Sequence, residues 1–306
     1  MPEHGGSVDG GRTGAGKITP HGELNWLNIS VNTTRRREAG MDLELNGKRA
    51  LVTGGSSGIG LAIARALAQE GADVAIASRT PEKVAQAVAR LKTETGGRII
   101  GVTVDTGSDA SVAEMVAGVV DAFGGLDILV NSAAIPAGGV RPPTLAEVTN
   151  EAFHSEINIK VMGYLRCARE AAPHMKANGW GRIINISGLA AREAVAIIGS
   201  VRNVSVAALT KNLADELGPF GINVSVVHPG MTRTERTGPM VEALARANNC
   251  TLAEAEKQMA ATITIGRLVD ATEIAYVVAF LASPKSVAIT GDAIAAGGGR
   301  IGAIHY

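Results

Sequence analysis

The chain has little cysteine, no excess of charge and no long apolar run, and each absence excludes a class of protein. Its only cysteines, Cys167 and Cys250, cannot form a disulfide framework and favour a reducing compartment. The formal net charge is zero, so the charge balance predicts neither a nucleic-acid partner nor an anionic membrane partner. No apolar segment approaches the roughly 18–20 residues of a membrane span. We therefore expect a cytoplasmic protein.

What is present is enough material for one large domain. The chain has 306 residues and 46% hydrophobic residues, which supports a substantial core. Residues 1–40 show no sustained period of 2 or 3.6 and predict a disordered N-terminal tail, so Met41 is a candidate for the natural start. From residue 48 onward, strands alternate with helices, which is typical of a doubly wound parallel sheet. The sequence predicts a Rossmann-like α/β fold in a single domain over residues 41–306.

The hydrophobic pattern also places the elements of this domain. Strands are expected at 50–52, 73–78, 98–105, 126–133, 182–187, 222–228 and 292–295, with helices near 81–94, 109–123, 148–177, 200–218 and 271–282. Residues 235–265 indicate an inserted flap of two amphipathic helices. The apolar face of the flap favours a non-polar substrate and consists of Met240, Leu244, Leu252 and Met259.

The rest of the domain is organised around the glycine-rich stretch that follows the first strand. A strand, a glycine turn and a helix N-terminus together form an anion site, because free backbone N–H groups and the helix dipole face one point. Gly54 permits a sharp turn, Gly58 permits close approach of a pyrophosphate, and Gly60 permits the helix to lie close to the sheet. An ordinary structural loop can contain the same glycines. Only their spacing can therefore distinguish a cofactor-binding turn from such a loop.

That spacing, Thr53-Gly54-x-x-x-Gly58-x-Gly60, resembles the cofactor motif of the short-chain dehydrogenase/reductase family. The resemblance extends from about Leu43 to Gly299 and continues in Asn131 and Ala133, whereas Ser132 and Ala134 depart from the family's Asn-Asn-Ala-Gly. It implies a nicotinamide cofactor held by Thr53, Gly54, Ser56, Ser57, Gly58, Ile59, Gly60, Arg79, Asp105, Thr106, Asn131, Ala133, Pro229, Gly230 and Thr234.

The end of the second strand favours NADP(H), with NAD(H) also admissible. An acid at this position would hold the adenosine ribose and repel a 2′-phosphate. Here the position is Ser78, followed by Arg79, whose guanidinium can pair with a phosphate. A solvated surface arginine is the alternative interpretation.

The catalytic pattern of the family is matched at one position only. The resemblance implies an Asn on the long helix, and Asn158 matches it. Gly188 stands where the family has a Ser, and counting thirteen residues onward places Val201 and Ser205 at the Tyr and Lys of Tyr-x-x-x-Lys. No tyrosine near this motif replaces the lost one. The substitutes left open are His154, Ser187, Glu193, Ser200, Arg202, Asn203 and Ser205.

Three functions remain open. The first is an NADP(H)-dependent oxidoreductase with a non-standard active site, acting on a small carbonyl or alcohol. The second is a catalytically silent nucleotide-binding partner or regulatory subunit, and the third is a non-redox enzyme on the same fold. The resemblance implies a homo-dimer or homo-tetramer, and we assign no metal ligands. Because hydride transfer is mainly the chemistry of the cofactor, we rank the oxidoreductase first.

Overall fold

The computed structural model describes residues 41–135 and 141–304. The tail predicted for residues 1–40 lies outside the described residues. All described helices and strands belong to one unit, Leu43–Tyr306. Within the described part of the chain, no helix is long and apolar enough to cross a bilayer.

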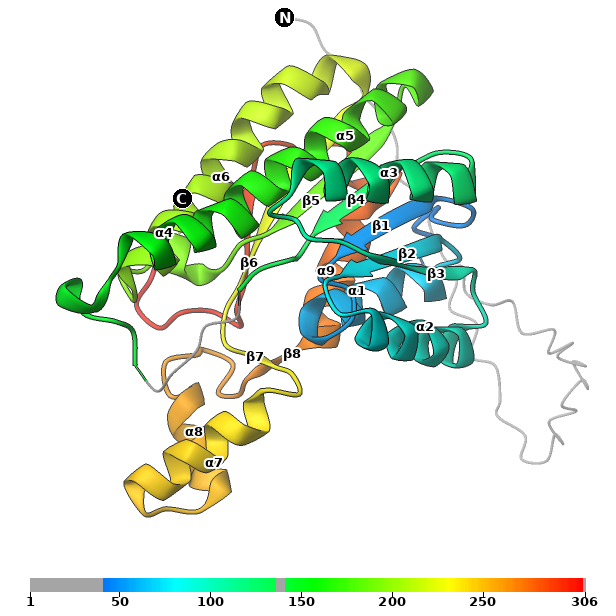
Figure 1. Ribbon diagram of the computed structural model, residues 1–306. Helices are drawn as coiled ribbons and strands as arrows, with labels where there is room; N and C mark the ends of the chain where they lie inside the picture. The colour runs from blue at the N-terminus through cyan, green and yellow to red at the C-terminus, as the bar shows by residue number, and fades with distance from the viewer. Residues whose placement is uncertain (1–40, 136–140, 305–306) are drawn as a thin grey trace, which may run out of the picture. The chain divides into compact units, whose positions relative to one another are not determined.

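A seven-stranded parallel sheet forms the centre of this unit (Figure 1). Its strand order is β3-β2-β1-β4-β5-β6-β9, so the strand order reverses between β1 and β4. The register places Val52 beside Ile76 on one side and Val130 on the other. The strands are β1 (Arg49–Thr53), β2 (Asp73–Ser78), β3 (Ile99–Thr103), β4 (Ile128–Asn131), β5 (Gly181–Ile186), β6 (Ile222–Pro229) and β9 (Ala293–Ala296).

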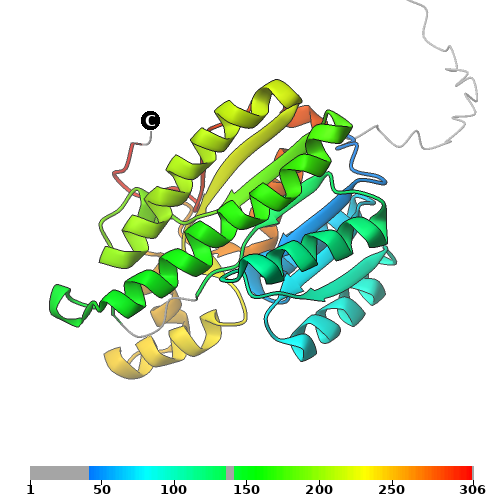
Figure 2. The ribbon, with the colours of Figure 1, turned by 45° about the horizontal axis from the view of Figure 1, so that its top comes forward.

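Helices cover both faces of the sheet because alternate strand residues point to opposite sides. Val52 packs in the cluster under α1, α2 and α9, whereas Leu51 packs in the cluster under α3, α5 and α6. Figure 2 shows α5 and α6 side by side across the second face. The helices are α1 (Gly58–Gln69), α2 (Pro81–Thr95), α3 (Asp109–Phe123), α5 (Gly163–Asn178), α6 (Ile197–Leu217) and α9 (Ala271–Ala282).

The predicted doubly wound α/β fold is confirmed, and helices α3 and α9 have the predicted bounds. The prediction of one continuous helix over residues 148–177 was wrong. This region is divided into α4 (Asn150–Ile157), a π-helical segment (Asn158–Met162) and α5. Within this segment the buried residue is Lys160.

The region expected to form a flap contains two helices, α7 (Thr237–Asn248) and α8 (Leu252–Ala260). Their shared contact is made by Val241, Ala245 and Ala255. Met240 and Leu252, which were expected on the apolar face, are 49% and 56% exposed. A two-stranded sheet that the sequence did not predict, β7 (Thr232–Arg233) with β8 (Val269–Asp270), precedes and follows these helices.

Candidate active site

A cavity of about 430 Å³ lies at the carboxyl ends of β1, β2, β4 and β5, where ligands bind in doubly wound sheets. One end is formed by the glycine turn after β1, and the other by the residues after β5. Its lining residues are Gly54, Ser56, Ser57, Gly58, Ile59, Gly60, Ser78, Arg79, Thr80, Lys83, Val104, Thr106, Ser132, Ala133, Ala134, Ile135, Ile159, Lys160, Ile186, Ser187, Arg202, Thr234, Glu235 and Arg236.

The glycine turn has the geometry that its spacing predicts. Gly54 has φ +68°, and a Cβ there would lie 2.8 Å from the carbonyl oxygen of Ser132. A Cβ at Gly60 would lie 2.3 Å from the carbonyl oxygen of Gly54, so α1 can begin against the turn only with glycine at this position. Gly58 has φ +55°, and its Cβ position is in van der Waals contact with Thr234 at 3.6 Å and Glu235 at 3.8 Å.

An anion already lies at the N-terminus of α1. The backbone N–H of Gly58 donates a 3.2 Å hydrogen bond to Oε2 of Glu235, which precedes α7. This carboxylate occupies a position where a phosphate oxygen of a bound dinucleotide would receive the same N–H. The sequence analysis did not assign Glu235 to the site. Its position directly after Thr234, a predicted cofactor residue, was the available signal.

Three side chains at the end of β2 and the start of α2 line a further part of the cavity wall. Ser78 Oγ is buried and has no hydrogen-bond partner among the described residues. Arg79 is exposed, and Lys83, in the first turn of α2, lies on the same wall of the cavity. Neither cation forms an ion pair within the described segments. A buried hydroxyl without a partner beside two unpaired cations fits an additional phosphate. Sequence reasoning missed Lys83, one helical turn after Arg79.

Most of the predicted cofactor residues line the cavity, but five do not: Thr53, Asp105, Asn131, Pro229 and Gly230. Thr53 is fully buried, and its Oγ accepts hydrogen bonds from the N–H groups of Ser132 and Ala133 at 3.1 and 3.3 Å. The Asn131 amide donates to Asn185 Oδ1 at 2.9 Å inside the sheet. Thr53 and Asn131 therefore hold strand ends in place and do not line the cavity.

The structure corrects the register assumed for the α6 motif. Val201 is 42% exposed, and Ser205 Oγ donates back to the Val201 carbonyl of its own helix at 2.8 Å. Asn203, by contrast, is 5% exposed and contacts the end of β5. Asn203 therefore points inward, whereas Val201 and Ser205 do not. The residues that counting assigned to the motif thus lie away from the polar contacts after β5.

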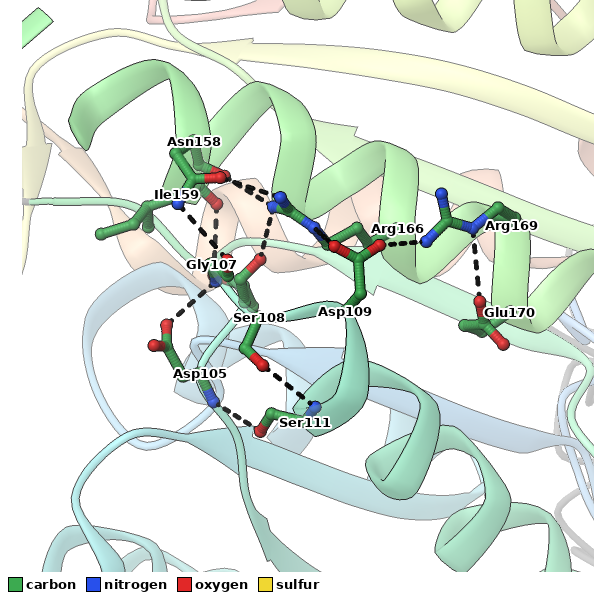
Figure 3. A network of polar contacts seen from close by, with 11 residues as sticks. Asp105, Gly107, Ser108, Asp109, Ser111, Asn158, Ile159, Arg166, Arg169 and Glu170 are labelled. Carbon is green, nitrogen blue, oxygen red and sulfur yellow. Dashed lines mark hydrogen bonds and ion pairs between the residues drawn. The ribbon is translucent and has the colours of Figure 1, made fainter. Parts of the chain in front are cut away.

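The side chain of Asn158, the residue that matches the family's helix Asn, is held by hydrogen bonds within the protein. Its Nδ2 donates to the Gly107 carbonyl at 3.3 Å, and its Oδ1 accepts a 2.9 Å bond from Arg166 (Figure 3). Arg166 also donates to the Asn158 carbonyl at 3.1 Å, and to Asp109 at 3.0 Å. The Asn158 side chain thus joins the π-helical segment to α5 and the loop after β3, and it does not line the cavity.

The side chain that the π-helical segment does present to the cavity is Lys160. It is 3% exposed, and its Nζ donates to the Ser187 carbonyl at 3.0 Å and to Asn203 Oδ1 at 2.8 Å. Burial lowers the pKa of Lys160 to about 7, because desolvation disfavours the ammonium form. Sequence reasoning missed this residue. The available signal was a lysine between Ile159 and Val161 in an otherwise apolar run.

Ser187 completes a three-residue contact with Lys160 and Asn203. Its Oγ donates to the Asn203 carbonyl at 3.0 Å. Gly188, which stands where the family has its hydroxyl, has extended backbone, and a Cβ there would lie 3.2 Å from Asn203 Nδ2. The polar contacts after β5 therefore involve Ser187, and Gly188 contributes no side chain.

Three further substitutes, and Tyr164 of α5, which was not among them, have different surroundings. Arg202 lines the cavity, pairs with Glu156 of α4 and donates to the Ile135 carbonyl at 3.2 Å. His154 is exposed, and Glu193 pairs with Arg300 at 3.2 Å. Tyr164 is 1% exposed and donates to the Ile186 carbonyl at 2.9 Å, and burial raises the pKa of its phenol. None of His154, Glu193 and Tyr164 lines the cavity.

Comparison with known proteins agrees with this geometry. A family model described as "Enoyl-(Acyl carrier protein) reductase" matches residues 54–300. The short-chain reductase protein NovJ of Streptomyces niveus is 35% identical over 82% of this chain and 93% of its own length. The human dehydrogenase/reductase SDR family member 4 is 34% identical over 88% of this chain and 93% of its own length.

Solved structures give the same result. L-Sorbose reductase from Gluconobacter frateurii, complexed with NADPH and L-sorbose, is 31% identical with a TM-score of 0.80, covering 86% of this chain and 100% of its own. A single-residue variant of actinorhodin polyketide ketoreductase with NADPH is 33% identical with a TM-score of 0.75, covering 82% of this chain and 96% of its own. The family-model match over most of the chain and these relatives establish that the protein belongs to the short-chain dehydrogenase/reductase family.

Proposed function

We propose that this protein is an NADP(H)-dependent oxidoreductase that interconverts a small carbonyl compound and its alcohol. The observation that carries the proposal is the continuous cavity of about 430 Å³ that is lined both by the glycine turn after β1 and by the polar residues after β5. A dinucleotide needs both ends of this cavity. Its phosphates require the glycine turn, and its reactive ring must reach a substrate near the residues after β5. When bound, the cofactor supplies or accepts the hydride.

The residues present fit a dinucleotide with a 2′-phosphate. The α1 N-terminus holds a carboxylate through Gly58, which supports an anion site at the expected pyrophosphate position. At the adenosine end, the partnerless Ser78 hydroxyl and the cations Arg79 and Lys83 support recognition of the additional phosphate. The names of two relatives with solved structures include NADPH, which supports the same choice.

The far end of the cavity suits a small substrate of mixed character. Ile135, Ile159 and Ile186 supply apolar surface, while Lys160 and Ser187 supply the polar groups. A carbonyl compound whose oxygen faces the polar groups and whose carbon substituents face the isoleucines would satisfy both.

The test is a titration of the full chain with NADPH and NADH by nucleotide fluorescence, followed by a carbonyl panel monitored for NADPH oxidation. Binding with turnover supports the proposal. Failure to bind either nucleotide would refute it. Binding without turnover across a broad panel would favour the silent nucleotide-binding partner, which remains the second candidate because Gly188, Val201 and Ser205 stand where the resemblance expects Ser, Tyr and Lys.

We also infer that the protein assembles as a homo-dimer or homo-tetramer through α6. The outer face of this helix carries exposed Ile197, Val201 and Val204, which supports a contact between copies. Light scattering of Val204→Glu against the wild type tests this inference, and an unchanged mass would contradict it.

A further inference from the structure

Lys160 has a hydrogen-bonding capacity that its protein partners do not use up. An ammonium carries three N–H donors. Within the described residues, two acceptors take one bond each, the Ser187 carbonyl at 3.0 Å and Asn203 Oδ1 at 2.8 Å. The side chain also lines the cavity, so the remaining donor is available to a ligand.

We propose that Lys160 is the acid–base residue of this enzyme, giving a proton to the substrate's carbonyl oxygen during reduction, and that Asn203 is the positioning residue that holds its Nζ. The proposal rests on the proposed function, because it takes a carbonyl substrate and a reduced nicotinamide as given.

The step balances in atoms and electrons. The carbonyl carbon accepts a hydride, so a C–H bond forms and the C=O π pair moves onto oxygen. That oxygen takes the proton from Nζ of Lys160, an O–H bond forms, and the N–H pair stays on nitrogen as a neutral amine. The substrate has become an alcohol and the nicotinamide is oxidised. The amine then recovers a proton from water, and oxidation of an alcohol runs the same transfers in reverse.

Burial makes this amine a suitable acid near neutrality. General acids work best when their pKa is close to the working pH, and desolvation brings the pKa of Lys160 to about 7. The charged groups facing it come from the neighbouring helices α6 and α4. Of these, Arg202 lines the same cavity as Lys160 and forms an ion pair with Glu156, and desolvation alone accounts for the lowered pKa of Lys160.

The alternatives in the cavity are weaker. Arg202 holds its protons too tightly to donate one. Ser187 has no base to receive or supply its proton, because its hydroxyl donates to the backbone carbonyl of Asn203. Lys160 is the lining residue that combines a removable proton with a fixed position.

The first experiment measures Lys160 directly in the full-length wild-type protein. Acetic anhydride at graded pH acetylates only neutral amines, and mass spectrometry of the peptide containing Lys160 gives the midpoint. We expect a midpoint near neutrality and slower acetylation with NADPH bound. Asn203→Asp should raise the midpoint by about 1–3 pH units, because a carboxylate favours the ammonium. A wild-type midpoint near the ordinary lysine value of about 10.4 would overturn the proposal.

The second experiment uses turnover. Lys160→Met should bind NADPH as the wild type does while kcat falls about 10²–10⁴-fold. Asn203→Asp should shift the alkaline limb of the kcat profile upward, which a purely structural role would not do. Lys211→Met, on the exposed side of α6, is the matched control. Wild-type turnover in Lys160→Met would refute the role of Lys160 but leave the proposed function standing, whereas absence of NADPH binding would refute the proposed function.

Discussion

The ammonium of Lys160, on the π-helical segment, donates a 2.8 Å hydrogen bond to the side-chain oxygen of Asn203 on α6. The family pattern expects an amide from the earlier helix and an ammonium from the later one. Here the ammonium comes from the segment before α5, which also keeps its own amide, Asn158, and α6 contributes an amide. The charge therefore lies on the segment that Arg166 fixes, and α6 contributes only the amide that orients it.

Arg79 is expected to select NADPH over NADH. Arg79→Ala should weaken NADPH binding by about 1.5–3 kcal/mol, the range of a charge-assisted hydrogen bond, and leave NADH binding unchanged. Lys83→Ala should act in the same direction, because both residues line the same part of the cavity wall. Arg90→Ala, whose side chain is 58% exposed and pairs with Glu94, is the control. Fluorescence titration with both nucleotides measures these affinities. An equal loss of affinity for NADPH and NADH would contradict the role of Arg79 in selecting NADPH.

Glu235 is expected to compete with the dinucleotide for the α1 N-terminus. Glu235→Gln removes the charge that Gly58 now contacts, so NADPH should bind more tightly, by about 0.3–1 kcal/mol. The protein without nucleotide should be less stable by a similar amount, since the helix loses a favourable charge. Glu242→Gln, on the exposed side of α7, is the control. Weaker NADPH binding in Glu235→Gln would mean that this carboxylate helps the ligand.

Arg166 is expected to be the residue that fixes the π-helical segment. Arg166→Ala takes donors from the carbonyls of Thr106 and Asn158, and should destabilise the fold by about 1–3 kcal/mol. Arg169 pairs with the same Asp109 but is 53% exposed, so Arg169→Ala should cost only about 0–1 kcal/mol. Chemical denaturation measures both variants. Similar losses would show that the contact with Asp109, and not the backbone contacts, matters.

The orientation of α6 can be tested by cysteine reactivity. In a Cys250→Ser background, Val201→Cys should react rapidly with a thiol reagent because position 201 is 42% exposed. Asn203→Cys should react slowly, since position 203 is 5% exposed, and more slowly still with NADPH present. The natural Cys167 is buried and should contribute little background. Reversed rates would restore the register obtained by counting.

The sheet was predictable from the sequence because its signals are local. The strands are visible as apolar runs. The spacing of Gly54, Gly58 and Gly60 reflects the backbone constraints of a tight turn packed against a helix. Arg79 was found in the same way, from its place directly after a strand.

The catalytic end was not predictable in this way, because it depends on two features that leave weak signals. One is the π-helical segment, which turns Lys160 and not Asn158 toward the cavity. The other is the rotation of α6 about its axis, which turns Asn203 and not Ser205 inward. A one-residue or two-residue change in phase leaves the hydrophobic pattern readable but moves every polar side chain to another face.

Lys160 is expected to make stability depend on pH in a defined window. Its pKa is about 7 in the folded protein, against 10.5 for an ordinary lysine, so between these values the unfolded chain holds a proton that the folded protein has released. Stability rises with pH wherever the unfolded state binds more protons. The free energy of unfolding of the wild type, minus that of Lys160→Met, should therefore increase from pH 7 to pH 10.5, by up to about 1.4 kcal/mol per unit. Other groups titrate equally in both proteins and cancel in the difference. Denaturant unfolding at graded pH measures it, and a difference that stays flat across the window would show that Lys160 remains charged in the folded protein.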